Sequence, residues 1–328
     1  MPTSLADSIK REALALGFSG VGIASAAPLP DHQRAFRRYL AEGRHAGMAY
    51  LAQEPERRED PGRVLPGANS VIALAWAYDH GDHPPPPDAP SGKIARYAWG
   101  PDYHAVIEPR LERLKTFIHS RRPDAAIRCA VDHAPVLERA YAQAAGIGFI
   151  GKHTLLIAPD HGSWVLLAEL ITDLELPPDA PALGGCGSCT RCLDACPTTA
   201  LTGPFQLDAG RCIAYLTIEH KGAVTDALRP LVGEWLFGCD ICQEACPYNQ
   251  ASAIPAARDH AADADATQGN GLDPWLTLDE AEAPRSHGGH RDRFQGTAVR
   301  RVTPKQLARN AATVRANHAA GDRSLAGY

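Results

Sequence analysis

Four cysteines near the middle of the chain have the spacing of an iron–sulfur ligand run. Cys186, Cys189, Cys192 and Cys196 form the pattern C-x2-C-x2-C-x3-C, and Pro197 follows the last of them. In bacterial ferredoxins three thiolates of such a run bind one [4Fe–4S] cluster, whereas the fourth binds a second cluster. The spacing therefore predicts two clusters, and chemistry that involves electron transfer.

A second, incomplete run supplies further ligands. Cys239, Cys242 and Cys246, followed by Pro247, repeat the last three positions of the first run, but Leu236 occupies the first position. Cys212 is the unassigned cysteine between the two runs, so we expect it to replace the missing ligand. The predicted ligand sets are Cys186, Cys189, Cys192 and Cys246 for one cluster, and Cys196, Cys212, Cys239 and Cys242 for the other.

Zinc is the alternative metal, because C-x2-C pairs also have zinc-ligand spacing. The third cysteine of each run and the repeated Cys-Pro pair favour iron–sulfur clusters. Disulfides are not favoured, because eight of nine cysteines lie between residues 186 and 246 of a 328-residue chain that shows no evident secretory signal at its start. The ninth, Cys129, lies in an apolar strand pattern and is expected to be a small core residue.

Asp132 is the candidate acid. It ends the apolar segment 126–132, which is predicted to be a strand, and a helical pattern follows it. Binding sites of α/β sheets lie at the carboxyl ends of strands, which favours a role in proton transfer. The alternative is a helix-capping aspartate, which position alone favours.

Other polar residues also have two interpretations. Glu138 and Arg139, one turn beyond Asp132, could form a surface ion pair. Tyr103 and His104 share a loop with Trp99, an arrangement that suits a ligand pocket or a domain edge.

Three glycines spell a pattern that resembles a dinucleotide fingerprint. Gly146, Gly148 and Gly151 form G-x-G-x-x-G, but they follow a helical segment and precede a predicted strand. The fingerprint requires the opposite order, a strand before the glycines and a helix after them. Gly146 is therefore predicted to stop a helix, and neither NAD nor ATP is supported.

Apolar periodicity predicts an N-terminal domain that mixes helices and strands. In residues 4–16 apolar side chains recur on one helical face, and Gly17 follows as a helix stop. Further helices are expected at 106–120, 136–146 and 303–318, and strands at 18–24, 70–77, 126–132, 154–158 and 163–172. The pattern indicates an α/β domain, and the proline- and glycine-rich stretch 174–185 marks its end.

The net charge of −5 conceals an asymmetry near the C-terminus. Residues 256–284 contain seven acidic side chains and a single basic one, whereas residues 285–315 contain eight basic side chains and a single acidic one. The basic stretch could contact nucleic-acid phosphates. The alternative is a solvated helical face, which a charge run by itself favours.

The chain resembles the epoxyqueuosine reductases, cobalamin-dependent iron–sulfur enzymes of tRNA queuosine biosynthesis. The resemblance runs nearly from end to end. The segments that carry it are REDPGRVLPGANSVIALAWAY (58–78), WGPDYH (99–104), VDHAPVLER (131–139), GFIGKHTLLI (148–157), GSWVLLAELIT (162–172), GGCGSCTRCLDACPTTAL (184–201), GCDICQEACPYN (238–249) and FQGTAVRR (294–301).

The resemblance implies three parts: an α/β cobalamin-binding domain (1–175), a ferredoxin-like module with two 4Fe–4S clusters (176–255) and a short helical, tRNA-contacting region (256–328). The implied reaction reduces epoxyqueuosine to queuosine at the wobble position of a tRNA anticodon, with electrons passing through the clusters to cobalamin. The basic stretch is then better explained as a tRNA contact.

Individual residues follow from the same resemblance. Asp132 matches the family's proton donor, which outweighs the capping interpretation, and an acid is needed because an alkoxide is a poor leaving group. Arg58, His104, Arg139 and Lys152 are expected near the corrinoid. The corrinoid motif D-x-H-x-x-G is absent, since Asp102 and His104 begin it but Ile107 stands at the glycine position. Cobalamin is therefore expected to bind without a histidine ligand from that motif.

Three other functions compete with this one. A ferredoxin-type electron carrier would bind clusters but no corrinoid, and a cobalamin and iron–sulfur reductase of a small molecule would bind no tRNA. A tRNA-binding protein with structural clusters would be redox-silent. For the favoured function we expect a cytoplasmic monomer that needs an external electron donor and no membrane.

Overall fold

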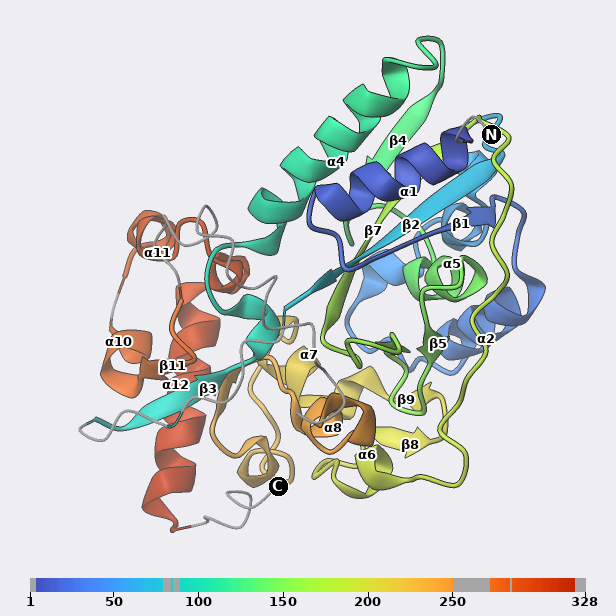
Figure 1. The fold of residues 1–328 in the computed structure, drawn as a ribbon. Coiled ribbons are helices and arrows are strands. Elements are labelled where there is room, and N and C mark those ends of the chain that lie inside the picture. The colour runs from blue at the N-terminus through green and yellow to red at the C-terminus, as the bar shows by residue number, and fades with distance from the viewer. Residues whose placement is uncertain (1–3, 79–83, 85–88, 251–271, 284, 322–328) are drawn as a thin grey trace.

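The computed structural model describes residues 4–78, 84, 89–250, 272–283 and 285–321. Its centre is a four-stranded sheet in the order β1-β2-β7-β4, in which every neighbouring pair is antiparallel (Figure 1). The strands are β1 (Gly20–Ser25), β2 (Ser70–Ala77), β7 (Val165–Thr172) and β4 (Ile127–Ala130).

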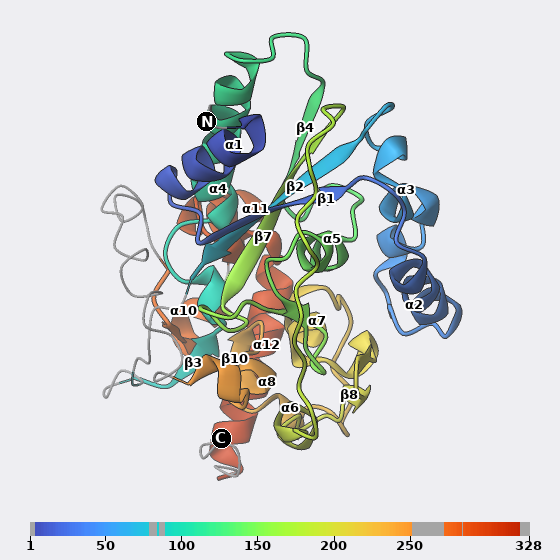
Figure 2. The ribbon, with the colours of Figure 1, turned by 45° about the vertical axis from the view of Figure 1, so that its right-hand side comes forward.

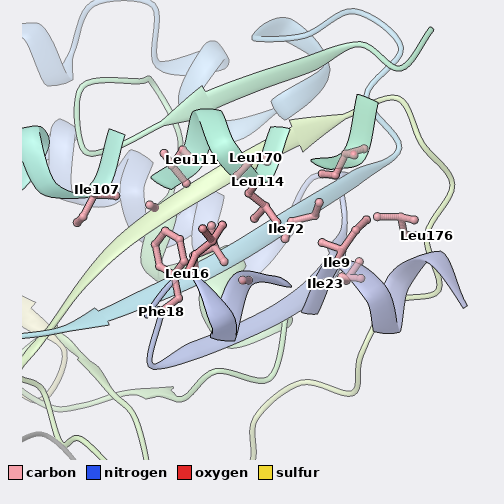
Figure 3. Close-up of a cluster of buried hydrophobic side chains, with 14 of the residues drawn as sticks. Ile9, Leu16, Phe18, Ile23, Ile72, Ile107, Leu111, Leu114, Leu170 and Leu176 are labelled. Carbon is pink, nitrogen blue, oxygen red and sulfur yellow. The ribbon is translucent and has the colours of Figure 1, made fainter. Parts of the chain in front are cut away.

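Both faces of this sheet are covered. Helices α1 (Leu5–Ala15) and α4 (Tyr103–His119) pack on one face, and α5 (Glu138–Ala144) packs on the other (Figures 1 and 2). Side chains alternate between the faces along β7, because successive residues of a strand point to opposite sides. Even-numbered Leu170 joins the core under α1 and α4, shown in Figure 3, whereas odd-numbered Ile171 joins the core under α5.

Helix α1 forms as its pattern predicts. The side chain of Ser4 accepts a hydrogen bond from the backbone N–H of Asp7 at the first turn, and Gly17 follows the helix with φ of +92°. Ile9 and Ala13 are fully buried. The expected strands at 70–77 and 163–172 are confirmed, whereas 154–158 contributes only β6 (Leu156–Ile157), paired with β5 (Phe149–Ile150).

The sheet contradicts one step of the reasoning about Asp132. The rule that places sites at the carboxyl ends of strands holds for parallel sheets, and this sheet is antiparallel. Asp132 instead lies in a loop that follows the edge strand β4. It has a left-handed backbone with φ of +44°.

The cysteine-rich segment folds into short helices and a hairpin. Its elements are α6 (Arg191–Asp194), β8 (Leu201–Gly203), β9 (Gln206–Leu207), α7 (Ile213–Ile218) and α8 (Ile241–Glu244). Each ferredoxin-type run starts its short helix within the run itself, because α6 contains Cys192 and α8 contains Cys242.

A second sheet unites distant parts of the chain. Its order is β10 (Trp235–Phe237), β3 (Ser91–Ile94) and β11 (Trp275–Thr277), and it packs against α12 (Pro304–Ala319) (Figure 1). The predicted C-terminal helix is thus confirmed, with a capping box between Thr303 and Gln306 at its start.

This second sheet draws one strand from each of the three predicted parts of the chain, so they share a core. The division at residues 175 and 255 stays a prediction. Part of the acidic stretch 256–284 lies outside the described residues, namely Arg258, Asp259, Asp263 and Asp265.

The remaining elements surround these two sheets, and among the described helices none is both long and apolar enough to cross a membrane. The α-helices are α2 (Pro30–Ala41), α3 (Pro55–Glu59), α10 (Leu278–Glu282) and α11 (His287–Arg293). The 3-10 turns are η1 (Ala49–Leu51), η2 (Pro61–Arg63), η3 (Arg96–Ala98), η4 (Ala209–Arg211), η5 (Pro230–Val232), η6 (Pro247–Asn249) and η7 (Ala298–Arg301).

Candidate active site

Asp132 is held by the first turn of α4. The hydroxyl of Tyr103 donates a hydrogen bond to Oδ2 of Asp132, and Nε2 of His104 lies 3.1 Å from Oδ1. Asp102 caps α4 by accepting from the backbone N–H of His104, and its Oδ1 also lies 2.8 Å from Nδ1 of the same imidazole. His104 therefore bridges two carboxylates.

This network sets the charge of the site. Burial acts to raise the pKa of Asp132, but the hydrogen bonds from His104 and Tyr103 outweigh it and leave the pKa below its ordinary value. Hydrogen bonds to Asp102 and then to Asp132 raise the pKa of His104 to about 10. At neutral pH the proton of the pair therefore resides on His104, next to an ionised Asp132.

The capping interpretation of Asp132 is wrong. The residue that precedes α5 is Leu137, and no side chain caps this helix. Glu138 accepts a hydrogen bond from the backbone N–H of Asp132 at 2.7 Å, and Arg139 donates to the carbonyl of Thr154. These contacts, rather than a surface ion pair, occupy Glu138 and Arg139.

A cavity of about 410 Å³ connects the acid to the cysteines. Asp132 and Tyr103 line it together with all four cysteines of the second predicted ligand set: Cys196, Cys212, Cys239 and Cys242. The rest of its wall includes apolar side chains of β7, among them Leu167. A group bound here would lie between an electron source and a proton source.

A second cavity of about 460 Å³ shares part of this wall. Asp132, Glu138 and Arg139 line both cavities, whereas Arg58 lines only the second. The Nε atom of Arg58 is buried and has no hydrogen-bond partner among the described residues. A ligand with carbonyl or phosphate oxygens would supply that partner.

His153 is a cavity residue that the sequence analysis missed. Its Nδ1 accepts from the backbone N–H of Leu155 at 3.1 Å, while its Nε2 is buried without a partner among the described residues. Burial lowers the pKa of His153 to about 4, so Nε2 carries the proton of a neutral ring. Its only signal in the sequence was its place in the segment GFIGKHTLLI.

Lys152, which is predicted to lie near the corrinoid, contacts the first cysteine run instead of the two cavities at Asp132. It lines neither of the two cavities that Asp132 lines. Its ammonium donates to the carbonyls of Gly187 and Cys189 at 2.7 and 2.8 Å, and its backbone N–H donates to Sγ of Cys186 at 3.4 Å. The ammonium of Lys152 is therefore held at the first cysteine run by hydrogen bonds to loop carbonyls.

The structure brings the cysteines together in two groups. Burial raises the pKa of Cys192 to about 11, and the neighbouring Cys186, Cys246 and Cys189 raise it further. Burial likewise raises the pKa of Cys242 well above its ordinary value, with additional effects from Cys212, Asp240, Cys196 and Cys192. The eight thiols are free of disulfides, and their division between two clusters stays a prediction.

Backbone amides surround these sulfurs in a way that suits clusters. Cys212 receives hydrogen bonds from the backbone of Tyr215 and Ala214, which act to lower its pKa against the effect of burial. Cys239 receives one from Ile241 in the same way. Hydrogen bonds to sulfur stabilise the anionic ligands of iron–sulfur clusters and tune their potentials.

A third group of side chains could hold a metal ion. One ligand atom each from His104, Asp132 and His133 lie within 4.8 Å of one another. Two imidazoles and a carboxylate are suitable ligands for a divalent transition metal. The hydrogen bond that Nδ1 of His104 donates to Asp102 resembles the outer-shell contacts that orient metal-binding histidines.

The basic stretch 285–315 is largely neutralised inside the fold. Arg293 pairs with Glu280, Arg301 with Glu219, and Arg315 with Asp279 and Glu282. Arg309 donates to backbone carbonyls of residues 216, 220 and 222. Arg293 and Arg301 are exposed, as the solvated-face interpretation predicts, but their charges are paired with acidic residues of the fold.

Two arginines of that stretch remain exposed at a cavity. Arg291 and Arg300 form no ion pair with the described residues, and they line a cavity of about 480 Å³ with His104 and Tyr103. Residues of α11 and η7 form much of this cavity, and Tyr103 and His104, which contact Asp132, form another part of its wall. Positive charge therefore lies beside the acid.

Comparisons with known proteins agree with this geometry. A family model described as "4Fe-4S double cluster binding domain" matches residues 185–249, and one described as "Epoxyqueuosine reductase QueG, DUF1730" matches residues 58–133. The epoxyqueuosine reductase of Synechococcus sp. (strain RCC307) is 42% identical over 325 residues, 95% of this chain and 94% of that protein. This chain belongs to the epoxyqueuosine reductase family. The family match and the double-cluster domain confirm the prediction of two 4Fe–4S clusters over the zinc alternative.

Members of the family from other bacteria are similar over comparable lengths. The epoxyqueuosine reductase of Xanthomonas campestris pv. campestris is 40% identical and the match covers 95% of this chain and 86% of that protein. An epoxyqueuosine reductase solved with a tRNA-TYR epoxyqueuosine-modified tRNA stem loop matches with a TM-score of 0.84 at 32% identity, covering 98% of this chain and 83% of that chain. The enzyme from Bacillus subtilis, solved with its catalytic aspartate loop swung out of the active site, matches with a TM-score of 0.83 at 32% identity, with the same coverage.

Proposed function

We propose that this chain reduces epoxyqueuosine to queuosine at the wobble position of tRNA, with cobalamin as the second cofactor and Asp132 as the proton donor. The observation that carries the proposal is the cavity of about 410 Å³ that Asp132 and Tyr103 line together with Cys196, Cys212, Cys239 and Cys242. A group bound in this cavity would contact both the acid and a cluster held by these cysteines. The family's reaction needs this combination.

The residues at the cavities fit a corrinoid. Arg58 and His153 present buried N–H groups without partners among the described residues, and the amide side chains of a corrinoid ring would accept from them. Arg139 lines both cavities and would help to hold the corrinoid there. When bound, cobalamin would supply low-valent cobalt, a strong nucleophile and reductant for the carbon–oxygen bond of an epoxide.

The two clusters would supply electrons one at a time. The proposed ligands are Cys186, Cys189, Cys192 and Cys246 for the first cluster, and Cys196, Cys212, Cys239 and Cys242 for the second. The second set lines the cavity, so its cluster would be the one adjacent to the cofactor. None of the cysteines of the first set lines either cavity, and an external donor would reduce that cluster first.

Asp132 and His104 would hold and move the proton. The pair shares one proton across the 3.1 Å contact, and in the structure that proton favours His104. When negative charge develops on the epoxide oxygen, Asp132 would take the shared proton from His104 and pass it to that oxygen. A positioned acid of this kind contributes about 10²- to 10⁴-fold to a rate.

The tRNA would enter beside the acid. Arg291 and Arg300 line the cavity of about 480 Å³ whose wall also contains Tyr103 and His104. Guanidinium groups bind phosphate oxygens with two parallel hydrogen bonds. We propose that these two arginines, rather than the whole basic stretch 285–315, contact phosphates near the wobble nucleotide.

The test is an anaerobic assay of the reconstituted enzyme with tRNA that carries epoxyqueuosine. The wild type is expected to retain about eight irons and one corrinoid and to form queuosine, detected by mass spectrometry of nucleosides. Asp132→Asn should retain both cofactors and lose at least about 10²-fold in turnover, whereas the exposed control Asp124→Asn should be unaffected. Iron without corrinoid in the wild type would instead support an electron carrier.

A further inference from the structure

Lys152 brings a positive charge to the first cysteine run. Its ammonium donates hydrogen bonds to the carbonyls of Gly187 and Cys189 at 2.7 and 2.8 Å. Its backbone N–H donates to Sγ of Cys186 at 3.4 Å. One residue therefore contacts the loop of the predicted first cluster through both its main chain and its side chain.

Two hairpins fix the backbone of Lys152. It lies in the turn from β5 to β6, where the backbone N–H of Gly151 donates to the carbonyl of Leu155 at 2.8 Å. The carbonyl of Lys152 accepts from the backbone N–H of Phe205 at 3.0 Å, and Phe205 lies in the turn between β8 and β9. The side chain therefore starts from a fixed point, and its ammonium is held at the other end by the loop carbonyls.

The charge of Lys152 is not cancelled by an acid. Its ammonium contacts neutral carbonyl groups, and it forms no ion pair with the residues that the structure describes. Three other lysines, in contrast, pair with carboxylates: Lys10, Lys93 and Lys115. Lys152 is partly buried, so solvent screens its field only in part.

The surroundings of this run suit an iron–sulfur cluster. Cys186 and Cys246, two ligands of the predicted first set, pack in one group with the apolar side chains of Phe149 and Ile157. Cys246 is buried there. Because apolar surroundings lower the local dielectric, a charge beside such a cluster has a larger effect on it than in water.

A fixed cation at this place favours the reduced form of the cluster. A 4Fe–4S cluster gains one negative charge when it takes up an electron, so a nearby positive charge stabilises the reduced form more than the oxidised form. The hydrogen bond from the backbone N–H of Lys152 to Sγ of Cys186 acts in the same direction, because it stabilises negative charge on the sulfur. Both contacts therefore raise the reduction potential.

We propose that Lys152 raises the reduction potential of the first 4Fe–4S cluster and so helps it to accept electrons from the external donor. The donor, a one-electron carrier, gives one electron to the oxidised cluster, and no bond breaks and no proton moves in this step. Lys152 is thus a positioning residue that acts through the cluster. The direction of electron flow rests on the proposed function, whereas the potential depends only on the clusters.

The experiment is an anaerobic redox titration of the reconstituted enzyme, followed by electron paramagnetic resonance. Lys152→Gln and Lys152→Met remove the charge, whereas Lys152→Arg keeps it. In both neutral variants the equilibrium constant for reduction of the first cluster should fall about tenfold, which is about 59 mV in potential. Lys152→Arg and the exposed control Lys221→Gln should match the wild type. The same titrations in Cys212→Ala, which should retain only the first cluster, assign the signal.

Each result bears on the proposal. Wild-type potentials in the neutral variants would overturn it. An equal fall in Lys152→Arg would overturn it too, because the lost contacts rather than the charge would then be responsible. If one neutral variant fails to fold, the other decides, and loss of about half the iron in both would make Lys152 only a structural support of the loop. A shifted potential in variants of a wild type that forms no queuosine would refute the proposed function and leave the role of Lys152 intact.

Discussion

Nε2 of His104 lies 3.1 Å from Oδ1 of Asp132, while Asp102 holds the opposite nitrogen of the same ring at 2.8 Å. The second contact fixes the orientation of the imidazole, because Asp102 is itself fixed as the cap of α4. Asp132 therefore faces a proton-carrying group in the free enzyme. This arrangement makes the acid a pair rather than a single carboxyl.

The pair predicts a pH-dependent contribution of His104 to stability. The folded-state pKa of His104, about 10, is above its unfolded value, so its stabilising effect is complete below about pH 6.5 and is lost as pH rises through about 10. We expect the difference in melting temperature between wild type and His104→Gln to shrink steadily from pH 6.5 to pH 10. His119→Gln, whose imidazole contacts only a backbone carbonyl, is the control. A difference that does not vary with pH would contradict the assignment.

Removal of one predicted cluster ligand should halve the iron content of the protein. Cys212→Ala is expected to lower the iron of the reconstituted protein from about eight to about four atoms per chain, because Cys212 belongs only to the second ligand set. Cys129→Ala should retain all the iron, since Cys129 packs against the sheet core outside both groups. Iron analysis with electron paramagnetic resonance of the reduced protein checks both variants. Full iron content in Cys212→Ala would show that another group completes the cluster.

Charge reversal at the exposed arginines should weaken tRNA binding. The double variant Arg291→Glu and Arg300→Glu is expected to lose affinity and to reduce the slope of log affinity against log salt by about one per lost phosphate contact. Lys305→Glu, exposed in the same region but away from the cavity, is the matched control. Arg301 is unsuitable for this test because it pairs with Glu219. Equal salt slopes for the double variant and wild type would exclude a phosphate contact.

A divalent transition metal should inhibit the enzyme at the acid. Zn²⁺ bound by His104, Asp132 and His133 would displace the proton that the reaction needs. We expect inhibition that EDTA reverses, with the concentration for half-inhibition raised at least about tenfold in His133→Ala. Iron analysis after the EDTA step shows whether the clusters were damaged. Identical Zn²⁺ sensitivity in His133→Ala and wild type would argue against this site.

The cysteine ligands and the main elements were accessible from the sequence because their signals are local. The spacing of the two ferredoxin-type runs predicted the cysteines that serve as ligands, and the four cysteines of the second predicted set line one cavity. Helices α1 and α12 followed from the 3.6-residue period of their apolar side chains, and strands β2 and β7 followed from continuous apolar runs. The glycine pattern was also judged correctly, because Gly146 has φ of +82° after α5 and acts as a helix stop.

The tertiary structure alone decided the direction of the sheet, the partners of the arginines and the surroundings of Glu169. Strand β3 pairs with β10 and β11, which lie more than a hundred residues later in the sequence. Pairing between such distant segments produces no periodic pattern in the local sequence. Glu169 interrupts an apolar strand pattern, and only the pairing of β7 with β2 and β4 shows that it is fully buried in the sheet. Composition and spacing report on neighbours along the chain, whereas the charge of a carboxyl depends on its neighbours in space.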